Sequence, residues 1–151
     1  MTEPADRAPI LVIGYGNDLR SDDGAGRWVA DRIDAMGLAG VEARSIMQLT
    51  PEVSLDIVER RWVVFVDASV ETEELRVDEI EPTPGATVMT HHGDPASLLA
   101  VCERVGQPRE RATRVSIPAR NLEMGNSFSP PAEGAARAAV DRIVAHIRSA
   151  G

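Results

Sequence analysis

Short apolar runs alternate along the chain with segments in which apolar residues recur every three or four positions. The first pattern is typical of buried strands, and the second of helices with one packed face. Their alternation predicts an α/β fold with a parallel or mostly parallel sheet. The predicted strands are 10–15, 41–46, 62–66, 75–80, 86–89 and 114–118, and the predicted helices are 24–36, 51–59, 94–105 and 132–149.

The apolar run Trp-Val-Val-Phe-Val at 62–66 is the strongest predicted strand. Its continuous hydrophobicity indicates a central parallel strand with both faces covered. Residues 75–80 alternate in polarity and are less apolar, which favours an edge strand, here expected to be antiparallel. Residues 82–85 contain proline and glycine and predict a turn. The expected core-facing helix residues are Ala25, Val29, Ile33 and Met36, Val53, Ile57 and Val58, Leu98, Cys102 and Val105, and Ala136, Val140, Ile143 and Ile147.

Composition limits the classes of function. The 151 residues suggest a single domain spanning 1–151, and the formal net charge of −8 argues against nucleic acid and anionic membranes as partners. No apolar run approaches the length of a membrane span, and the polar N-terminal segment lacks the apolar region of a signal peptide. Cytoplasmic localisation is therefore expected. The single cysteine, Cys102, excludes a disulfide within the chain and is expected to be a buried apolar residue.

The first loop follows the predicted strand 10–15 and contains Gly14-Tyr15-Gly16-Asn17. It lies at the carboxyl end of that strand, where open α/β sheets bind ligands. A dinucleotide-binding fingerprint would need a third glycine at position 19, which is Leu19. The glycines are therefore interpreted as allowing a sharp turn and the close approach of a partner.

Two adjacent carboxylates, Asp22 and Asp23, end this loop. One of them is expected to cap the helix that begins near Gly24, where a negative charge also suits the helix dipole. We assign the capping role to Asp22 and expect Asp23 to point into the cleft above the sheet.

Further candidate residues follow two other strands. Asp67 directly follows the run 62–66, so it either orders a loop or cap or contributes a carboxylate at the sheet edge. His91 and His92 are adjacent, so only one of them is expected to face the cleft. His146 lies near the end of the last helix and is expected at the surface. Two carboxylates and one imidazole at three strand ends would suit a divalent metal such as nickel or zinc, with coordination positions left for water or substrate.

In these motifs the chain resembles the hydrogenase maturation endopeptidases, which process the large subunit of nickel–iron hydrogenases. The resemblance spans nearly the whole chain, and its first motif is the most specific. The matching segments are Ile13-Gly14-Tyr15-Gly16-Asn17, Ser21-Asp22-Asp23-Gly24-Ala25-Gly26, Phe65-Val66-Asp67-Ala68, Thr90-His91-His92 with Leu98-Leu99, and Ile117-Pro118.

The resemblance implies a twisted five-stranded sheet between two layers of helices. It implies an endopeptidase that removes a C-terminal extension from the large-subunit precursor after nickel insertion. Asp23, Asp67 and His91 would contact the nickel that the precursor brings and would take part in metal-assisted hydrolysis. His91 matches the family spacing to Leu99 better than His92 does. Some members carry glutamate where this chain has Asp23, whose side chain is one methylene group shorter.

We further expect Gly14, Gly16, Asn17 and Gln48 to bind the substrate. The segment Gln48-Leu49-Thr50-Pro51-Glu52 resembles the branch that serves NAD-reducing, bidirectional hydrogenases. Three other functions stay open: a non-catalytic nickel-delivery or nickel-sensing protein using the same residues, a phosphate- or nucleotide-binding module on the glycine loop, and an ordinary zinc peptidase.

Overall fold

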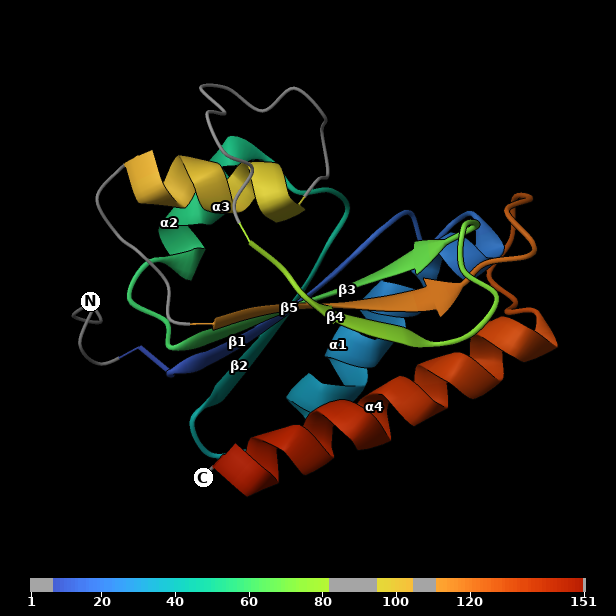
Figure 1. Ribbon diagram of the computed structural model, residues 1–151. Coiled ribbons are helices and arrows are strands. Elements are labelled where there is room, and N and C mark those ends of the chain that lie inside the picture. Colours follow the sequence, from blue (N-terminus) through green and yellow to red (C-terminus); the bar gives the residue numbers. More distant parts are fainter. Residues whose placement is uncertain (1–6, 82–94, 105–110, 151) are drawn as a thin grey trace.

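The computed structural model describes residues 7–81, 95–104 and 111–150 (Figure 1). Within these residues five strands form one sheet in the order β2-β1-β3-β5-β4. Four strands run parallel, whereas β4 lies at one edge and runs antiparallel to β5. The mostly parallel sheet and the antiparallel edge strand are confirmed. The strands are β1 (Ile10–Tyr15), β2 (Val41–Ile46), β3 (Trp62–Ser69), β4 (Arg76–Glu79) and β5 (Arg111–Pro118).

Helices cover both faces of the sheet, which gives three layers (Figure 1). One face is covered by α1 (Ala25–Ala35) and α4 (Pro130–Ala150). The other is covered by α2 (Ser54–Ile57) and α3 (Pro95–Arg104). Two 3-10 turns, η2 (Ser21–Gly24) and η3 (Pro51–Val53), lead into α1 and α2. The predicted three-layer α/β fold is confirmed.

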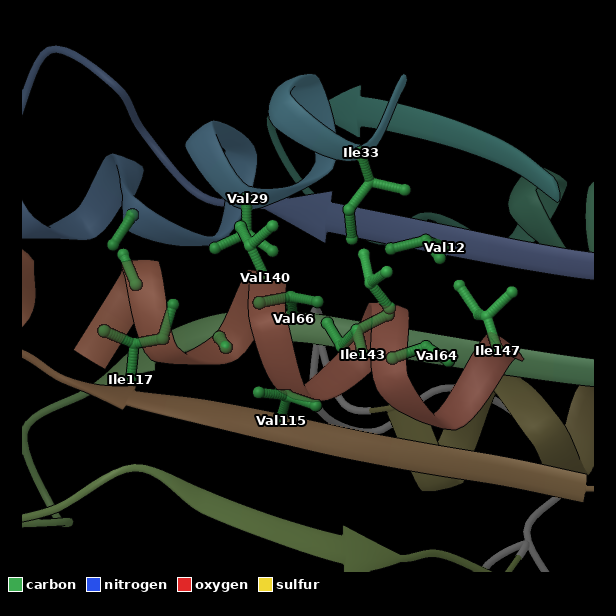
Figure 2. Close-up of a cluster of buried hydrophobic side chains, with 14 of the residues drawn as sticks. Val12, Val29, Ile33, Val64, Val66, Val115, Ile117, Val140, Ile143 and Ile147 are labelled. Atoms are coloured by element: carbon green, nitrogen blue, oxygen red, sulfur yellow. The ribbon is translucent and has the colours of Figure 1, made fainter. Parts of the chain in front are cut away.

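The central strands bury side chains on both faces because successive residues of a strand point in opposite directions. Figure 2 shows the cluster between the sheet and the helices α1 and α4. It includes Val12, Val64, Val66, Val115 and Ile117 from the strands, and Val29, Ile33, Val140, Ile143 and Ile147 from the helices. The cluster on the other face includes Leu11, Ile13, Val63 and Phe65 from the strands, with Ile57, Leu98, Leu99 and Cys102 from α2 and α3.

Several local predictions differ from the structure. Strand β3 continues past residue 66 to Ser69, so Asp67 lies within it, and β5 begins at Arg111 rather than at 114. The predicted helix 51–59 is instead η3 followed by the short α2, because Val58 has an extended ψ of 141° and Glu59 a left-handed φ of +67°, neither of which continues a helix. Met36 was expected in the core but is 45% exposed, since α1 ends at Ala35 and the chain turns away at Gly37. The predicted turn 82–85, the strand 86–89 and both His91 and His92 lie outside the described residues.

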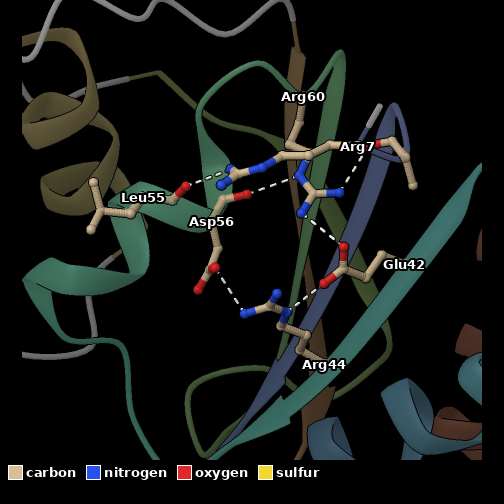
Figure 3. Close-up of polar contacts among 7 residues, drawn as sticks. Arg7, Glu42, Arg44, Leu55, Asp56 and Arg60 are labelled. Atoms are coloured by element: carbon tan, nitrogen blue, oxygen red, sulfur yellow. Dashed lines mark hydrogen bonds and ion pairs between the residues drawn. The ribbon is translucent and has the colours of Figure 1, made fainter. Parts of the chain in front are cut away.

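A network of ion pairs and hydrogen bonds lies at the amino edge of the sheet (Figure 3). The Arg60 side chain is almost fully buried and donates to the carbonyls of Ala8 and Asp56 and to Glu42 Oε1, each at 2.9 Å. Glu42 also pairs with Arg44, which reaches Asp56 at 2.8 Å. Burial acts to raise the pKa of Glu42, but the two arginines outweigh it, and the pKa is lowered. The network joins the chain before β1 to β2 and α2.

The first turn of α1 packs directly on the backbones of β1 and β3. A Cβ atom on Gly26 would lie 2.2 Å from the carbonyl oxygen of Val66 and 3.0 Å from the Cα atom of Asp67. A Cβ atom on Gly14 would lie 2.1 Å from the carbonyl oxygen of Gly26. The two glycines therefore allow a helix to approach the carboxyl ends of two central strands more closely than any larger residue permits.

Gly26→Ala should lower the free energy of unfolding by about 1–3 kcal/mol, because the added methyl group overlaps the β3 backbone. The matched control is Gly134→Ala in α4, where an added Cβ meets nothing within 4 Å. This control should raise stability by up to about 1 kcal/mol, since alanine is the better helix former. Urea unfolding of both variants measures the difference. Equal stability of the two would contradict the close packing.

Candidate functional site

The first loop is ordered around Asp23. The Oδ2 atom of Asp23 accepts a hydrogen bond from the backbone N–H of Asn17 at 2.7 Å, and Asn17 Oδ1 accepts from the N–H of Leu19 at 2.9 Å. Gly16 has a φ of +142°, and a Cβ there would lie 2.1 Å from the Asp23 carbonyl oxygen. The loop thus holds one oxygen of the half-buried Asp23 carboxylate against the end of β1.

Asp22 is fully buried and has a different role from the one predicted. Its carboxylate accepts hydrogen bonds from the backbone N–H groups of Arg120, Asn121 and Ser129 and from the Ser129 hydroxyl, at 2.6–2.9 Å. Neither η2 nor α1 has a side-chain cap hydrogen bond, so the predicted capping of the adjacent helix by Asp22 or Asp23 is wrong. Asp22 instead binds the loop that leads from β5 into α4.

The same two loops are also joined through their backbones. The N–H of Ser21 donates to the carbonyl of Gly125 at 2.8 Å, and the N–H of Gly125 donates to the carbonyl of Leu19 at 2.8 Å. The Ser21 hydroxyl adds a bond to the carbonyl of Glu123 at 2.7 Å. Ser21 adopts a φ of +52°, an uncommon value for serine that these three bonds maintain. The first loop therefore has a fixed place above the carboxyl edge of the sheet.

Asp67 lies in β3 and is only 7% exposed. Its Oδ2 atom accepts hydrogen bonds from the Tyr15 hydroxyl at 2.9 Å and from Arg114 Nη2 at 2.6 Å. Its Oδ1 atom is buried and has no hydrogen-bond partner within the described part of the chain. A buried carboxylate oxygen without a partner is uncommon and costs stability, so it marks this position for explanation.

Asp67 lies near the carboxyl end of β3, and Asp23 lies in the segment after the neighbouring parallel strand β1, at the same edge of the sheet. The last residue pair between β1 and β3 is Gly14 with Val66, so Asp67 lies directly beyond the pairing. Gly26, three residues after Asp23, also lies close to Asp67: a Cβ atom on Gly26 would lie 3.0 Å from the Cα atom of Asp67. The structure thus places the two predicted carboxylates on one edge, as the strand order implies.

The third predicted ligand, His91, cannot be placed, because it lies outside the described residues. Figure 1 shows that the following helix, α3, begins nearer the carboxyl edge of the sheet than it ends. That helix covers the face of the sheet on which the Tyr15 side chain lies. Among the residues that the structure describes, no three His, Cys, Asp or Glu side chains form a metal-binding group. The three-ligand site stays a prediction.

Sequence reasoning missed two residues that contact Asp67. Tyr15 ends β1 and is 8% exposed, and Arg114 lies within the otherwise mostly buried strand β5. A cation inside a mostly buried strand is a signal that an anion lies nearby, because an unpaired buried charge is very costly. Two other expectations hold: Cys102 is fully buried, and His146 is exposed on α4. Gln48 is exposed just after β2.

Comparison with solved structures identifies the fold. The hydrogenase maturating endopeptidase HybD from E. coli superposes with a TM-score of 0.72 at 22% identity, over 94% of this chain and 93% of that one. The chain has the fold of the hydrogenase maturation endopeptidases. The hydrogenase 2 maturation peptidase from a Thaumarchaeota archaeon matches with a TM-score of 0.69 at 25% identity, over 91% and 97% of the two chains.

A third maturation protease, HycI from Thermococcus kodakarensis, matches with a TM-score of 0.67 at 23% identity, over 91% of this chain and 90% of that one. The resemblance to hydrogenase maturation endopeptidases drawn from the sequence motifs is therefore confirmed at the level of the fold. No protein-family model and no curated protein sequence matches the chain. None of the helices in the described residues is long and apolar enough to cross a membrane.

Asp22→Asn should lower the free energy of unfolding at pH 7 by about 2–4 kcal/mol, because one amide N–H₂ would then face backbone donors. Burial acts to raise the pKa of Asp22, but the bonds from Ser129, Asn121 and Arg120 outweigh it, so the pKa is lowered from its usual value. A lowered pKa stabilises the fold above about pH 4, and this contribution is lost as the pH falls through the folded-state value.

The difference between wild type and Asp22→Asn should therefore be largest at pH 7 and shrink below about pH 4, as measured by urea unfolding at pH 7 and pH 3. Asp23→Asn is the matched control in the adjacent position. It removes one carboxylate bond, to the N–H of Asn17, and should cost about 1 kcal/mol. Similar losses for both variants at pH 7 would show that Asp22 has no special structural role.

Proposed function

We propose that the chain is an endopeptidase that removes the C-terminal extension of a nickel–iron hydrogenase large-subunit precursor after nickel insertion. The observation that supports this most directly is the buried Asp67 carboxylate, whose Oδ1 atom has no partner among the described residues. It lies at the carboxyl edge of a sheet with the maturation-endopeptidase fold, beside the loop that holds Asp23. Ligands bind at this edge in open α/β sheets.

In this proposal nickel arrives as part of the substrate. Asp23, Asp67 and His91 complete the coordination of a nickel ion that the precursor already holds, and cleavage thereby reports that nickel is present. Carboxylate oxygens and an imidazole nitrogen suit a borderline divalent ion. A set of three such donors without a thiolate is expected to bind free metal weakly. A precursor without nickel lacks the metal that anchors it to these residues and is therefore expected to bind weakly.

Hydrolysis then needs an activated water molecule. A water polarised by the substrate's nickel, or deprotonated by Asp23 or Asp67, can attack the scissile carbonyl carbon; the peptide C–N bond then breaks, and the proton from the water passes to the leaving amine. The described residues offer no thiol for this step, because Cys102 lies in α3 with its side chain fully buried in the core. Asp23, Asp67 and His91 are therefore proposed to act in both metal recognition and catalysis. The binding of substrate by Gly14, Gly16, Asn17 and Gln48 stays a prediction.

The edge around Asp23 and Asp67 also offers apolar contacts for a protein substrate. Exposed apolar side chains lie in the loops after all four parallel strands, namely Leu19 after β1, Met47 after β2, Val70 after β3 and Met124 after β5. Met124 is 78% exposed, and the neighbouring Gly125 is hydrogen-bonded to the carbonyl of Leu19. Apolar side chains gathered on one side of a molecule mark interaction sites. We propose that these four contact the precursor.

Cleavage of the nickel-loaded precursor tests the site. Asp67→Asn, Asp23→Asn and His91→Ala should each lower kcat/KM by at least about 100-fold, since even the partners of metal ligands contribute 10- to 100-fold. His92→Ala is the matched control and should keep most of the activity. Precursor without nickel should not be cleaved by wild type. Equal processing by all variants would remove the site assignment, and an intact precursor with wild type would instead favour nickel delivery or sensing.

Met124→Ser should raise KM for the precursor about 10-fold with kcat unchanged, because burying such a side chain is worth about 1.5 kcal/mol. Leu55→Ser is the control, since Leu55 is 62% exposed on α2 but lies away from this edge. The carbonyl of Leu55 accepts a hydrogen bond from Arg7, near the amino edge of the sheet. Steady-state kinetics and thermal unfolding of both variants provide the measurement. An unchanged KM for Met124→Ser would exclude Met124 from substrate binding.

A further inference from the structure

The carboxylate of Asp67 is held from one side only. Among the described residues, the Tyr15 hydroxyl and Arg114 Nη2 both donate to the same oxygen, Oδ2, at 2.9 Å and 2.6 Å. The other oxygen, Oδ1, is buried and has no partner within the described residues. The two oxygens of one carboxylate thus have opposite surroundings.

This arrangement fixes the orientation of the carboxylate. The terminal torsion of an aspartate is broad, so hydrogen bonds decide the plane in which the carboxylate lies. Charge-assisted bonds such as that from an arginine are about twice as strong as neutral ones. With Oδ2 bound by a cation and a phenol, rotation of the carboxylate would break both bonds. Oδ1 is therefore the oxygen left to meet a ligand.

The two donors come from the strands on either side of β3. Tyr15 is the last residue of β1, and Arg114 lies opposite Phe65 in the pairing of β3 with β5. These three strands form the centre of the sheet, in the order β1-β3-β5. Side chains carried by such rigid elements hold a ligand more accurately than side chains carried by loops.

Arg114 also offsets the burial of the Asp67 charge. The Asp67 side chain is only 9% exposed, and an unpaired carboxylate at that depth would strongly destabilise the fold. A purely structural pair would use both carboxylate oxygens, since each buried lone oxygen carries its own cost of desolvation. Hydrogen bonds to Oδ2 alone offset the charge of the carboxylate and leave Oδ1 available to bind a metal ion.

We propose that Tyr15 and Arg114 are positioning residues that hold Asp67 with its Oδ1 atom directed at the nickel of the bound precursor. This inference rests on the proposed function, in which Asp67 contacts that nickel. Neither residue touches the substrate in this role. Both act by restricting the carboxylate to one oxygen as the metal contact.

The test compares Tyr15→Phe and Arg114→Met with wild type in two measurements. The first is kcat/KM for cleavage of nickel-loaded precursor. The second is the Kd for the same precursor prepared without nickel. Positioning predicts that each variant loses about 10- to 100-fold in kcat/KM, as partners of metal ligands do, with the Kd for nickel-free precursor unchanged. Tyr15→Phe keeps the aromatic ring and so tests the role even if Arg114→Met folds poorly.

Arg111→Met is the matched control, because Arg111 also lies in β5 but at its amino end, where it pairs with the exposed Glu79 at 2.8 Å. It should keep the wild-type kcat/KM. Unchanged cleavage by Tyr15→Phe and Arg114→Met would overturn the inference. So would an equal loss with Arg111→Met, or a parallel loss of affinity for nickel-free precursor. Failure of wild type itself to cleave nickel-loaded precursor would instead refute the proposed function.

Discussion

The first turn of α1 rests on the backbones of β1 and β3 through two glycines, and this contact determines where the candidate site can lie. Because Gly26 lies against Val66 and Asp67, the segment before α1 must cross the carboxyl ends of the central strands. That segment is η2, which carries Asp22 and Asp23. A helix held one side-chain thickness farther away would move both carboxylates off the edge that Asp67 occupies.

Two buried aspartates on this edge are stabilised in contrasting ways. Asp22 uses both oxygens, each bound by N–H or O–H donors of the 120–129 loop, and so acts as a structural anion. Asp67 uses one oxygen, bound by Tyr15 and Arg114. A buried polar group with a purely structural role requires a hydrogen-bond partner for each of its polar atoms. The contrast is the physical reason to assign chemistry to Asp67 and architecture to Asp22.

The sequence predicted those features that depend on local patterns. Strands β1 and β2 were predicted with their observed bounds, and Asp67 was assigned to the sheet edge because a carboxylate after five apolar residues has few roles in packing. The function of Asp22 was misjudged because its partners lie about a hundred residues away, at Arg120, Asn121 and Ser129. Tyr15 and Arg114 were missed since only the strand order brings β1 and β5 to either side of β3.

The adjacent residues Asp22 and Asp23 face different partners, one the loop before α4 and the other the backbone of Asn17. Insertion or deletion of a single residue between Gly16 and Gly24 would shift Asp22 and Asp23 relative to both sets of partners. A carboxylate would then leave the donors of the 120–129 loop unsatisfied, and its neighbour would no longer face the sheet edge. The length of this loop is therefore constrained as strictly as its composition, and redesign of the loop has to proceed by substitution.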